Sequence, residues 1–408
     1  MKVLMLAQTY APVVGGEERM VEDLSRELAR RGHEVVVATL RQPLGEPPPD
    51  QGGVRVRLLG SSVHSIPGIP THETTRYAPP LPDPRTTAEL RAVLREEEPD
   101  VVHAHNWLVD SYLPLSRRAR APLVLSLHDY GLLCPTKRLF LDGAVCSGPG
   151  PLKCLRHAAE FYGAAKGALL AGGTAIADPW ARRRVDLFVS VSSAVAELCR
   201  VAERPDHRVI PNFVRPLPPP PDPGDPRLDF LPEGDFALYF GDVSEDKGAG
   251  VLLEAHARLG AGAPPLVMVG RRNLDGLDAA PGVVAPGPLP HALAIEAVRR
   301  SAFTVAPSIW AEPFGIVALE AAAAAKPVLA SASGGLPDVV VDGETGLLLP
   351  AGDAEALSVA MARLFANPAE RERMGAAARQ RVGTVFSPEA VVPRFEQAYA
   401  DSRAGLKG

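Results

Sequence analysis

Residues 2–8 and 34–39 are short apolar runs, and residues 17–31 between them place apolar side chains at every third or fourth position. The short runs predict buried strands, and the middle segment predicts an amphipathic helix. A strand, a helix and a second strand in this order are typical of a parallel sheet, which binds ligands beyond the carboxyl ends of its strands. Gly15 and Gly16 lie at that end, where bare backbone can approach a phosphate or a sugar. A glycine turn without a ligand explains the pair equally well.

The same alternation continues along the chain. Further predicted strands are residues 101–104, 123–127, 187–191, 209–210, 236–240, 265–269, 303–306 and 327–330. Predicted helices of the second half are residues 248–259, 291–300, 315–325, 353–365 and 369–382. Residues 216–226 separate the two series and contain seven prolines, so they can form neither a helix nor a central strand.

These patterns predict an α/β protein with two doubly wound parallel-sheet domains. Residues 1–212 form the first domain, residues 213–234 a proline-rich linker and residues 235–386 the second domain. We expect residues 387–408 to form a C-terminal helix that can pack back on the first domain. Two such domains joined by one linker predict a cleft between them, which is a preferred ligand site.

Composition excludes several classes of protein. The 43 Lys and Arg residues against 48 Asp and Glu residues give a net charge of −5, which argues against a general nucleic-acid-binding protein. Four cysteines in 408 residues do not make a disulfide scaffold. The sequence has no recognisable signal peptide and no apolar run long enough to span a membrane, so we expect a cytoplasmic protein.

Residues 307–325 read PSIWAEPFGIVALEAAAAA and carry the strongest motif. The pattern predicts a helix that begins near Gly315, with free N–H groups at its start that suit a diphosphate. Glu312 lies just outside this start and Glu320 about a turn inside it. Carboxylates at these positions can accept hydrogen bonds from sugar and ribose hydroxyl groups, so the motif suits a nucleotide sugar. Taken alone, either glutamate is better explained as an ordinary helix-start or solvated residue.

The stretch EPFGIVALE, with KPVLAS and GGLPDVV and DGETGLLLPAGD after it, resembles the signature of the retaining GT-B glycosyltransferases of family GT4. Looser matches follow the family's order, among them GGEERMVEDLSRELARRGHEVVV, VVHAHNW, LHDY and FGDVSEDKGAGVLLEAHARL. The resemblance covers nearly the whole chain. It implies a GT-B fold and transfer of a hexosyl unit from a nucleoside-diphosphate sugar to a hydroxyl acceptor, with retention of anomeric configuration and no cofactor for catalysis.

The resemblance also assigns donor-site residues: Gly15, Gly16, Gly241, Lys247, Leu289, Glu312, Phe314, Gly315, Ile316, Val317 and Glu320. By this assignment Glu320 binds the ribose and Glu312 the transferred sugar. Lys247 neutralises the leaving diphosphate, which makes Lys247 and Glu312 catalytic.

The resemblance also covers two histidine-bearing strand ends of the first domain. His128 resembles the family's catalytic histidine that faces the donor sugar, although a histidine simply hydrogen-bonded at a strand end is the alternative. His105, Asn106 and Trp107 are expected to bind the acceptor. Because His103 and His105 alternate along their strand, we expect only one of them to face the cleft and choose His105. Trp107 fits a core or rim position as well as an acceptor platform.

One position departs from the family pattern. Asp242 stands where members usually carry an arginine, and a carboxylate cannot neutralise a diphosphate. Either Arg271 or Arg272 replaces that charge, or donor binding is weaker. The departure keeps open a catalytically silent nucleotide-sugar binding module, and a sugar-nucleotide epimerase on the same fold is a further alternative.

Cys134, Cys146, Cys154 and His157 lie close together in a segment rich in glycine and proline. Three thiolates and an imidazole form a common structural zinc set, so a structural zinc ion is one expectation and three unlinked thiols the other. Basic clusters at residues 117–120 and at residues 182–184 can contact an anionic membrane peripherally, although solvated surfaces are the simpler interpretation.

Overall fold

The computed structural model describes residues 1–405 except residues 14, 46–51, 64–74, 223, 275 and 278–279. The chain divides into two compact units. Unit 1 comprises Met1–Leu139, Ser147–Pro211 and Val391–Gly408, and unit 2 comprises Phe140–Cys146 and Asn212–Ala390. The division after Pro211 lies next to the predicted end of the first domain, and most of the last helix groups with unit 1.

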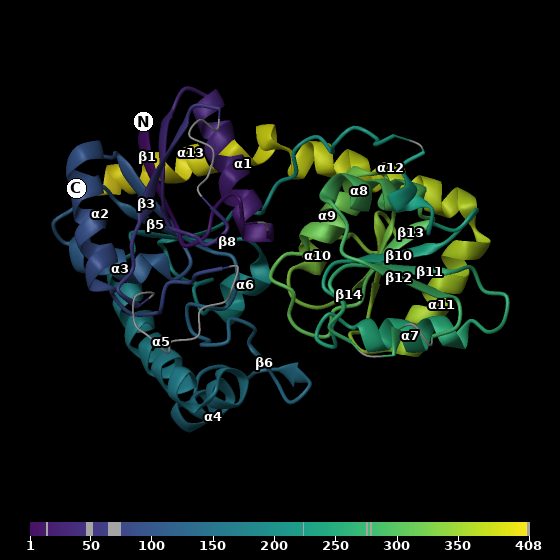
Figure 1. Ribbon diagram of the computed structural model, residues 1–408. Coiled ribbons are helices and arrows are strands. Elements are labelled where there is room, and N and C mark those ends of the chain that lie inside the picture. The colour runs from purple at the N-terminus through teal and green to yellow at the C-terminus, as the bar shows by residue number, and fades with distance from the viewer. Residues whose placement is uncertain are drawn as a thin grey trace. The chain divides into compact units, whose positions relative to one another are not determined.

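The core of unit 1 is a seven-stranded parallel sheet in the order β3-β2-β1-β4-β5-β8-β9 (Figure 1). Its strands are β1 (Lys2–Ala7), β2 (Glu34–Leu40), β3 (Val54–Leu59), β4 (Val101–His105), β5 (Leu123–Leu127), β8 (Leu187–Ser190) and β9 (His207–Val209). The order reverses between β1 and β4, where Ala7 pairs with His105. Such a reversal point is where doubly wound sheets bind ligands.

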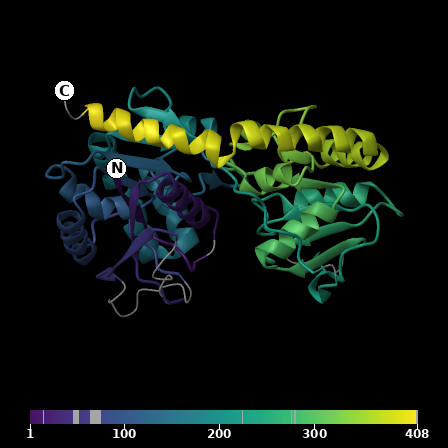
Figure 2. The same cartoon turned by 90° about the horizontal axis from the view of Figure 1, so that it is seen from above.

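Helices α1 (Gly16–Arg30), α2 (Pro84–Glu97), α3 (Leu108–Ser116), α4 (Pro151–Tyr162), α5 (Ala164–Arg184), α6 (Ser193–Leu198) and α13 (Pro388–Gly405) belong to this unit for most or all of their length. Figure 2 shows α13 running along unit 1. Arg31, at the end of α1, donates to Glu396 at 2.9 Å, and Arg394 donates to the Val209 carbonyl of β9 at 2.5 Å. Both α1 and the last strand of the sheet therefore hold α13.

The core of unit 2 is a six-stranded parallel sheet in the order β12-β11-β10-β13-β14-β15. Its strands are β10 (Ala237–Phe240), β11 (Leu266–Val269), β12 (Val283–Gly287), β13 (Phe303–Ala306), β14 (Val328–Ser331) and β15 (Gly346–Leu349). Its helices are α7 (Ala249–Arg258), α8 (His291–Arg300), α9 (Ile316–Ala323), α10 (Leu336–Val339), α11 (Ala354–Ala366) and α12 (Pro368–Val385), with a 3-10 turn at Pro226–Leu228. Here the order reverses between β10 and β13, and Phe303 is fully buried in the core.

The predicted α/β class with two doubly wound parallel sheets is confirmed. The strands at residues 123–127 and 303–306 begin and end where the apolar runs predict. The sequence pattern gave no bounds for strands β3, β12 and β15, for helices α2–α6 and α10, or for a short hairpin of β6 (Phe140–Leu141) and β7 (Ala144–Val145). No helix in the described part of the chain is both long and apolar enough to cross a bilayer.

Candidate active site

Unit 2 has a pocket just beyond the carboxyl ends of β10 and β13, with an empty volume of about 520 Å³, part of it open solvent. Glu312 lies in its wall, and one of its carboxylate oxygens, Oε2, accepts three hydrogen bonds. The donors are Lys247 Nζ at 2.6 Å, Trp310 Nε1 at 3.0 Å and Ser308 Oγ at 3.2 Å. These contacts fix the orientation of the carboxylate.

The second oxygen of Glu312, Oε1, has no hydrogen-bond partner among the described residues. It is therefore available to a hydroxyl group of a ligand in the same pocket. The Lys247 ammonium also lies 4.6 Å from the ring centroid of Trp310, over the indole face. A cation held between a carboxylate and an aromatic ring is already positioned for an anionic ligand.

The start of α9 forms another wall of this pocket. Gly315 precedes the helix with a φ of +94°, and a Cβ atom there would lie 2.6 Å from Leu336 Cδ2, so only glycine suits the position. The backbone N–H groups of Ile316 and Val317 have no partner within the described chain. Phe314 is buried against Phe386 and anchors the turn. Free N–H groups at a helix start bind anions.

Glu320 is only 6% exposed, and its Oε1 lies 2.6 Å from Nε2 of His291. His291 begins α8, two residues after the partly buried Leu289. Sequence reasoning missed His291 because 29 residues separate it from Glu320 and only the packing of α8 on α9 joins them.

Asp242 follows Gly241, which has a φ of +137° directly after β10. Arg271 donates to both Asp242 oxygens, from Nε at 2.8 Å and from Nη2 at 2.7 Å. The aspartate that departs from the family pattern thus holds an arginine from the adjacent strand end beside the pocket.

Unit 1 brings the two predicted histidines together at the ends of β4 and β5. His105 Nδ1 lies 2.8 Å from His128 Nε2, and the two rings stack with centroids 5.1 Å apart. Burial lowers the pKa of His128 to about 4 and that of His105 well below its usual value. Both imidazoles are therefore neutral at pH 7.

The reason given for choosing between His103 and His105, that they point to opposite sides of the sheet, is wrong. Residues two apart on a strand project from the same side of the sheet, and the two ring centroids lie 4.2 Å apart. His103 is fully buried between Tyr399 Oη, at 2.8 Å, and Ser126 Oγ, at 2.7 Å. It ties the C-terminal helix to the sheet, whereas His105 contacts His128.

Asn106 has a φ of +46° and donates from Nδ2 to Glu17 of α1. Burial, and secondarily the nearby Glu18, raises the pKa of Glu17 to about 8. Gly15 and Gly16 begin the same helix, so a glutamate that is largely neutral at pH 7 stands beside this helix start. Glu17 is a site residue that the sequence pattern did not single out.

Trp107 is buried rather than open as a platform, with 7% of its surface exposed. Its Nε1 donates to the Gly131 carbonyl at 2.8 Å, and Lys137 Nζ lies 4.3 Å from its ring centroid. The indole therefore supports a wall of the pocket beside His128.

The structure gives the zinc prediction no support. Cys134 Sγ lies 3.3 Å from Thr136 Oγ1, and Cys154 Sγ accepts from the Gly150 N–H at 3.3 Å. Cys146 and His157 complete no site with them, because no three His, Cys, Asp or Glu side chains of the described chain are placed to hold a metal ion.

Comparison with known proteins matches both units of the chain to glycosyl transferase families. The family described as "Glycosyl transferase 4-like domain" matches residues 15–212, and the family "Glycosyl transferases group 1" matches residues 226–381. The chain belongs to the group 1 glycosyl transferases. It is therefore a transferase enzyme, and its unit 2 site lies within the group 1 match.

Curated relatives cover nearly the whole glycosyltransferase. It is 30% identical to D-inositol 3-phosphate glycosyltransferase 1 of Catenulispora acidiphila over 99% of this chain and 94% of the relative. It is 28% identical to glycogen synthase of Mycobacterium tuberculosis over 99% of this chain and 96% of the relative.

Solved structures share its fold. Sucrose-phosphate synthase of Thermosynechococcus elongatus superposes with a TM-score of 0.76 at 22% identity, covering 99% of each chain. Anabaena Alr3699/HepE in complex with UDP-glucose gives a TM-score of 0.69 at 18% identity, over 98% of this chain and all of that one. These likenesses confirm the predicted GT-B fold class.

Proposed function

We propose that this glycosyltransferase moves a hexosyl unit from a nucleoside-diphosphate sugar bound on unit 2 to a hydroxyl acceptor bound on unit 1. The arrangement around Glu312 supports the proposal most directly: Oε2 is fixed by three donors while Oε1 is left for a ligand, beside two free N–H groups of α9. Hydrogen-bond acceptors for hydroxyl groups lie beside hydrogen-bond donors for phosphate groups, and this combination matches a sugar joined to a diphosphate.

Within this donor site each group has one task. Glu312 Oε1 accepts from a hydroxyl of the transferred sugar, and the N–H groups of Ile316 and Val317 bind the diphosphate. Glu320 accepts from the ribose, in place of or beside His291. Lys247 balances the charge that develops on the leaving diphosphate, so no metal ion is needed for this step. Solved GT-B structures with UDP-glucose and with ADP, from Anabaena and Arabidopsis thaliana, show that this fold accommodates nucleotide ligands.

We assign the shared proton of the histidine pair to Nδ1 of His105. His105 Nε2 is buried without a partner among the described residues, and a buried bare lone pair is more common than a buried unpaired N–H group. His105 then donates to His128 Nε2, and the proton of neutral His128 is on Nδ1. His128 can therefore donate one hydrogen bond to an oxygen of the reacting sugar.

Retention follows from a front-side displacement in our proposal. The bond from the anomeric carbon to the diphosphate oxygen breaks while the acceptor oxygen attacks the same face. The acceptor proton passes to the departing phosphate oxygen, so no other base is required. Proton NMR of the fresh product tests this: it should show the anomeric coupling of the donor, and an inverted coupling would refute the mechanism.

A catalytically silent binding module is the second candidate, because of Asp242. The pairing of Asp242 with Arg271 weakens that alternative, since it places a cation beside the pocket. Slow hydrolysis of the donor without acceptor, lost in Lys247→Met, would support the transferase. A donor that binds and is never hydrolysed or transferred would support the silent module.

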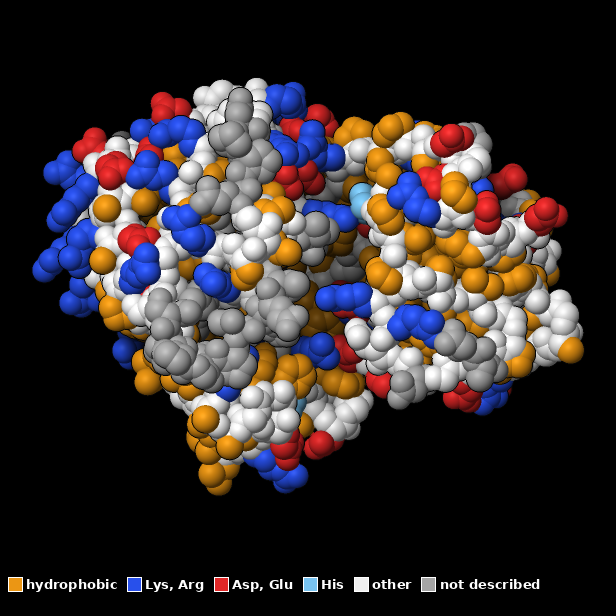
Figure 3. Space-filling view, viewed as in Figure 1, with side chains coloured by type: hydrophobic (Ala, Val, Ile, Leu, Met, Phe, Trp, Pro, Cys, Tyr) orange, Lys and Arg blue, Asp and Glu red, His pale blue; other side chains and the backbone are white. Residues whose placement is uncertain are grey.

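We also propose that unit 1 contacts an anionic membrane from the cytoplasm. The first basic cluster forms part of a groove with an empty volume of about 1460 Å³, open solvent included. Four arginines line it whose side chains form no hydrogen bond or ion pair with any described residue: Arg91, Arg95, Arg118 and Arg120. Lys and Arg side chains are densely placed on the face of unit 1 that carries α2 and α3 (Figure 3). Gathered like charges favour an anionic surface.

In the second basic cluster Arg182 is already held, because it bonds Asp178 and the carbonyls of Cys199 and Arg200. Flotation with phosphatidylcholine vesicles, with and without phosphatidylglycerol, tests the groove. Anionic vesicles should carry the wild type but not the Arg95→Glu/Arg118→Glu double variant. The control Arg156→Glu, on α4, should still float, and equal flotation of all three proteins would refute the proposal.

A further inference from the structure

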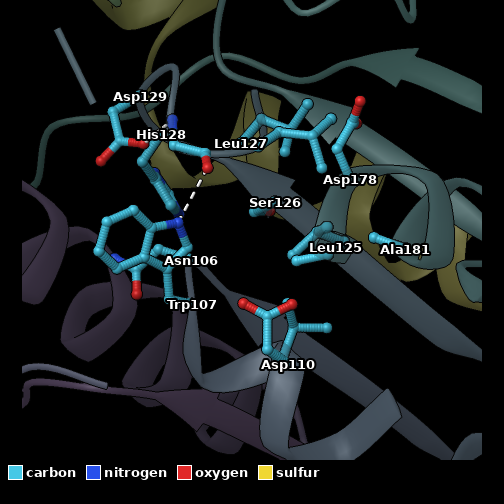
Figure 4. Close-up of a pocket in the computed structure, with 14 residues that line it drawn as sticks. Asn106, Trp107, Asp110, Leu125, Ser126, Leu127, His128, Asp129, Asp178 and Ala181 are labelled. Carbon is cyan, nitrogen blue, oxygen red and sulfur yellow. Dashed lines mark hydrogen bonds between the residues drawn. The ribbon is translucent and has the colours of Figure 1, made fainter. Parts of the chain in front are cut away.

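The pocket beside His128 contains a buried carboxyl group that nothing in the described chain satisfies. The pocket has an empty volume of about 420 Å³, part of it open solvent, between β5, α3 and α5. Asp110, in the first turn of α3, is 3% exposed and has no side-chain hydrogen bond or ion pair to any described residue. Figure 4 shows its carboxyl oxygens turned toward the middle of the pocket, between Trp107 and Leu125.

An unpaired buried carboxyl group is unfavourable in a folded protein. Desolvation disfavours its charged form, and no hydrogen bond or ion pair from the described chain offsets that cost. Burial raises the pKa of Asp110 to about 8, with nearby Lys137 acting in the opposite direction. The packing of α3 therefore maintains a costly group at one point of the pocket, as expected where a ligand completes it.

The other residues that line the pocket define which kind of ligand can bind beside Asp110. No lysine or arginine is among the described residues that line the pocket. Its other carboxylates already have partners: Asp178 accepts from Arg182 at 2.6 Å, and Asp129 accepts from the Gly131 N–H at 2.7 Å. Leu125, Leu127 and Ala181 supply apolar walls. Apolar walls, a lining without lysine or arginine and one unpaired carboxyl group suit a small positively charged group.

We propose that this pocket binds a protonated amino group of the acceptor, paired with Asp110. The proposal rests on the proposed function, in which unit 1 holds the acceptor. His128 lines the same pocket, so an acceptor anchored by its amino group would bring its hydroxyl groups to the catalytic histidine. At pH 7 an ammonium group displaces the proton that Asp110 holds and pairs with the carboxylate, whereas a hydroxyl group leaves Asp110 protonated and forms only a neutral hydrogen bond. The inferred acceptor class is therefore an amino sugar or another amine-bearing polyol.

Binding of D-glucosamine and D-glucose, measured by titration calorimetry at pH 7 without donor, tests the proposal because the two sugars differ at one substituent. A hydrogen bond between charged groups contributes about 1.5–3 kcal/mol, and removing the proton from Asp110 at pH 7 offsets about 1.4 kcal/mol of it, so we expect D-glucosamine to bind the wild type severalfold, up to about tenfold, more tightly than D-glucose. Asp110→Asn should reduce that ratio to about one. N-acetyl-D-glucosamine, which is neutral, should show no preference over D-glucose.

Asp178→Asn is the matched control, because it makes the same substitution in the same pocket at a carboxylate that Arg182 already pairs with. It should keep the preference. Asp110→Ser serves as a second variant if Asp110→Asn fails to fold. The proposal is overturned if the wild type shows no preference, if D-glucosamine does not bind, or if the Asp110 variants keep the preference. Nucleotide titration is run separately: a chain that prefers D-glucosamine yet binds no nucleotide would refute only the proposed function.

Discussion

Replacing Asp110 by asparagine should stabilise unit 1 at neutral pH, less at pH 5, and hardly at all below pH 4. The pKa of Asp110 is about 8 in the folded chain, against 3.8 for an ordinary aspartate. Between pH 5 and pH 7 the folded state holds a proton that the unfolded state lacks, so folding stability falls as the pH rises. The slope is about 1.4 kcal/mol per pH unit. The gain from Asp110→Asn should therefore be about 2.7 kcal/mol larger at pH 7 than at pH 5.

Urea unfolding followed by tryptophan fluorescence measures this difference. The Trp310→Phe background removes the unit 2 signal and leaves Trp107 and Trp180, which both lie in unit 1. Asp83→Asn is the control. Burial raises the pKa of Asp83, but hydrogen bonds from the backbone N–H groups of Ser62, Thr86 and Val63 outweigh burial and bring the pKa down to about 2.

Asp83 is ionised in both states at pH 5 and at pH 7. Its substitution should therefore destabilise unit 1 by about 2 kcal/mol at both pH values. An Asp110→Asn effect that does not change between pH 5 and pH 7 would refute the reasoning, because it would mean that the folded state does not hold the extra proton.

Two further predictions concern the sites themselves. His105→Asn keeps an N–H group near the position of Nδ1 and should retain most of kcat. In steady-state kinetics, His105→Ala should lower kcat about tenfold or more with little change in the donor KM. Equal effects of the two variants would contradict the proposed proton position. Gly315→Ala places a side chain on a residue in the left-handed region and against Leu336. Thermal unfolding should show that the free energy of unfolding falls by about 1–2 kcal/mol, and titration should show weaker nucleotide binding. An unchanged affinity would argue against a role for the start of α9.

The strands were predictable because burial on both faces makes them short apolar runs. The run at residues 123–127 became β5 without change, and β4 extended only to His105. The sequence pattern did not predict β3, because this strand lies at the edge of the sheet and carries Arg55 and Arg57, which pair with glutamates of α2. A strand with charged residues on one face does not look apolar in sequence.

Site residues on one continuous motif were predictable, and their partners were not. Glu312 and Glu320 stand out because a helix start fixes what surrounds them. His291 and Asp110 stand out only in the folded structure, which places His291 against Glu320 and Asp110 in the wall of a pocket. The zinc prediction was unsupported for the same reason, since the spacing of cysteines does not determine where their sulfur atoms point.

Titration calorimetry with UDP-, GDP-, ADP- and dTDP-glucose tests the central claim most directly, that the unit 2 pocket binds a nucleoside-diphosphate sugar. The wild type is compared with Glu320→Ala and with the control Glu254→Ala, an exposed glutamate on α7 that pairs with Arg258. We expect one donor to bind the wild type and the control alike, and to bind Glu320→Ala at least tenfold more weakly. Failure of all four donors to bind, or equal binding to all three proteins, would contradict the account.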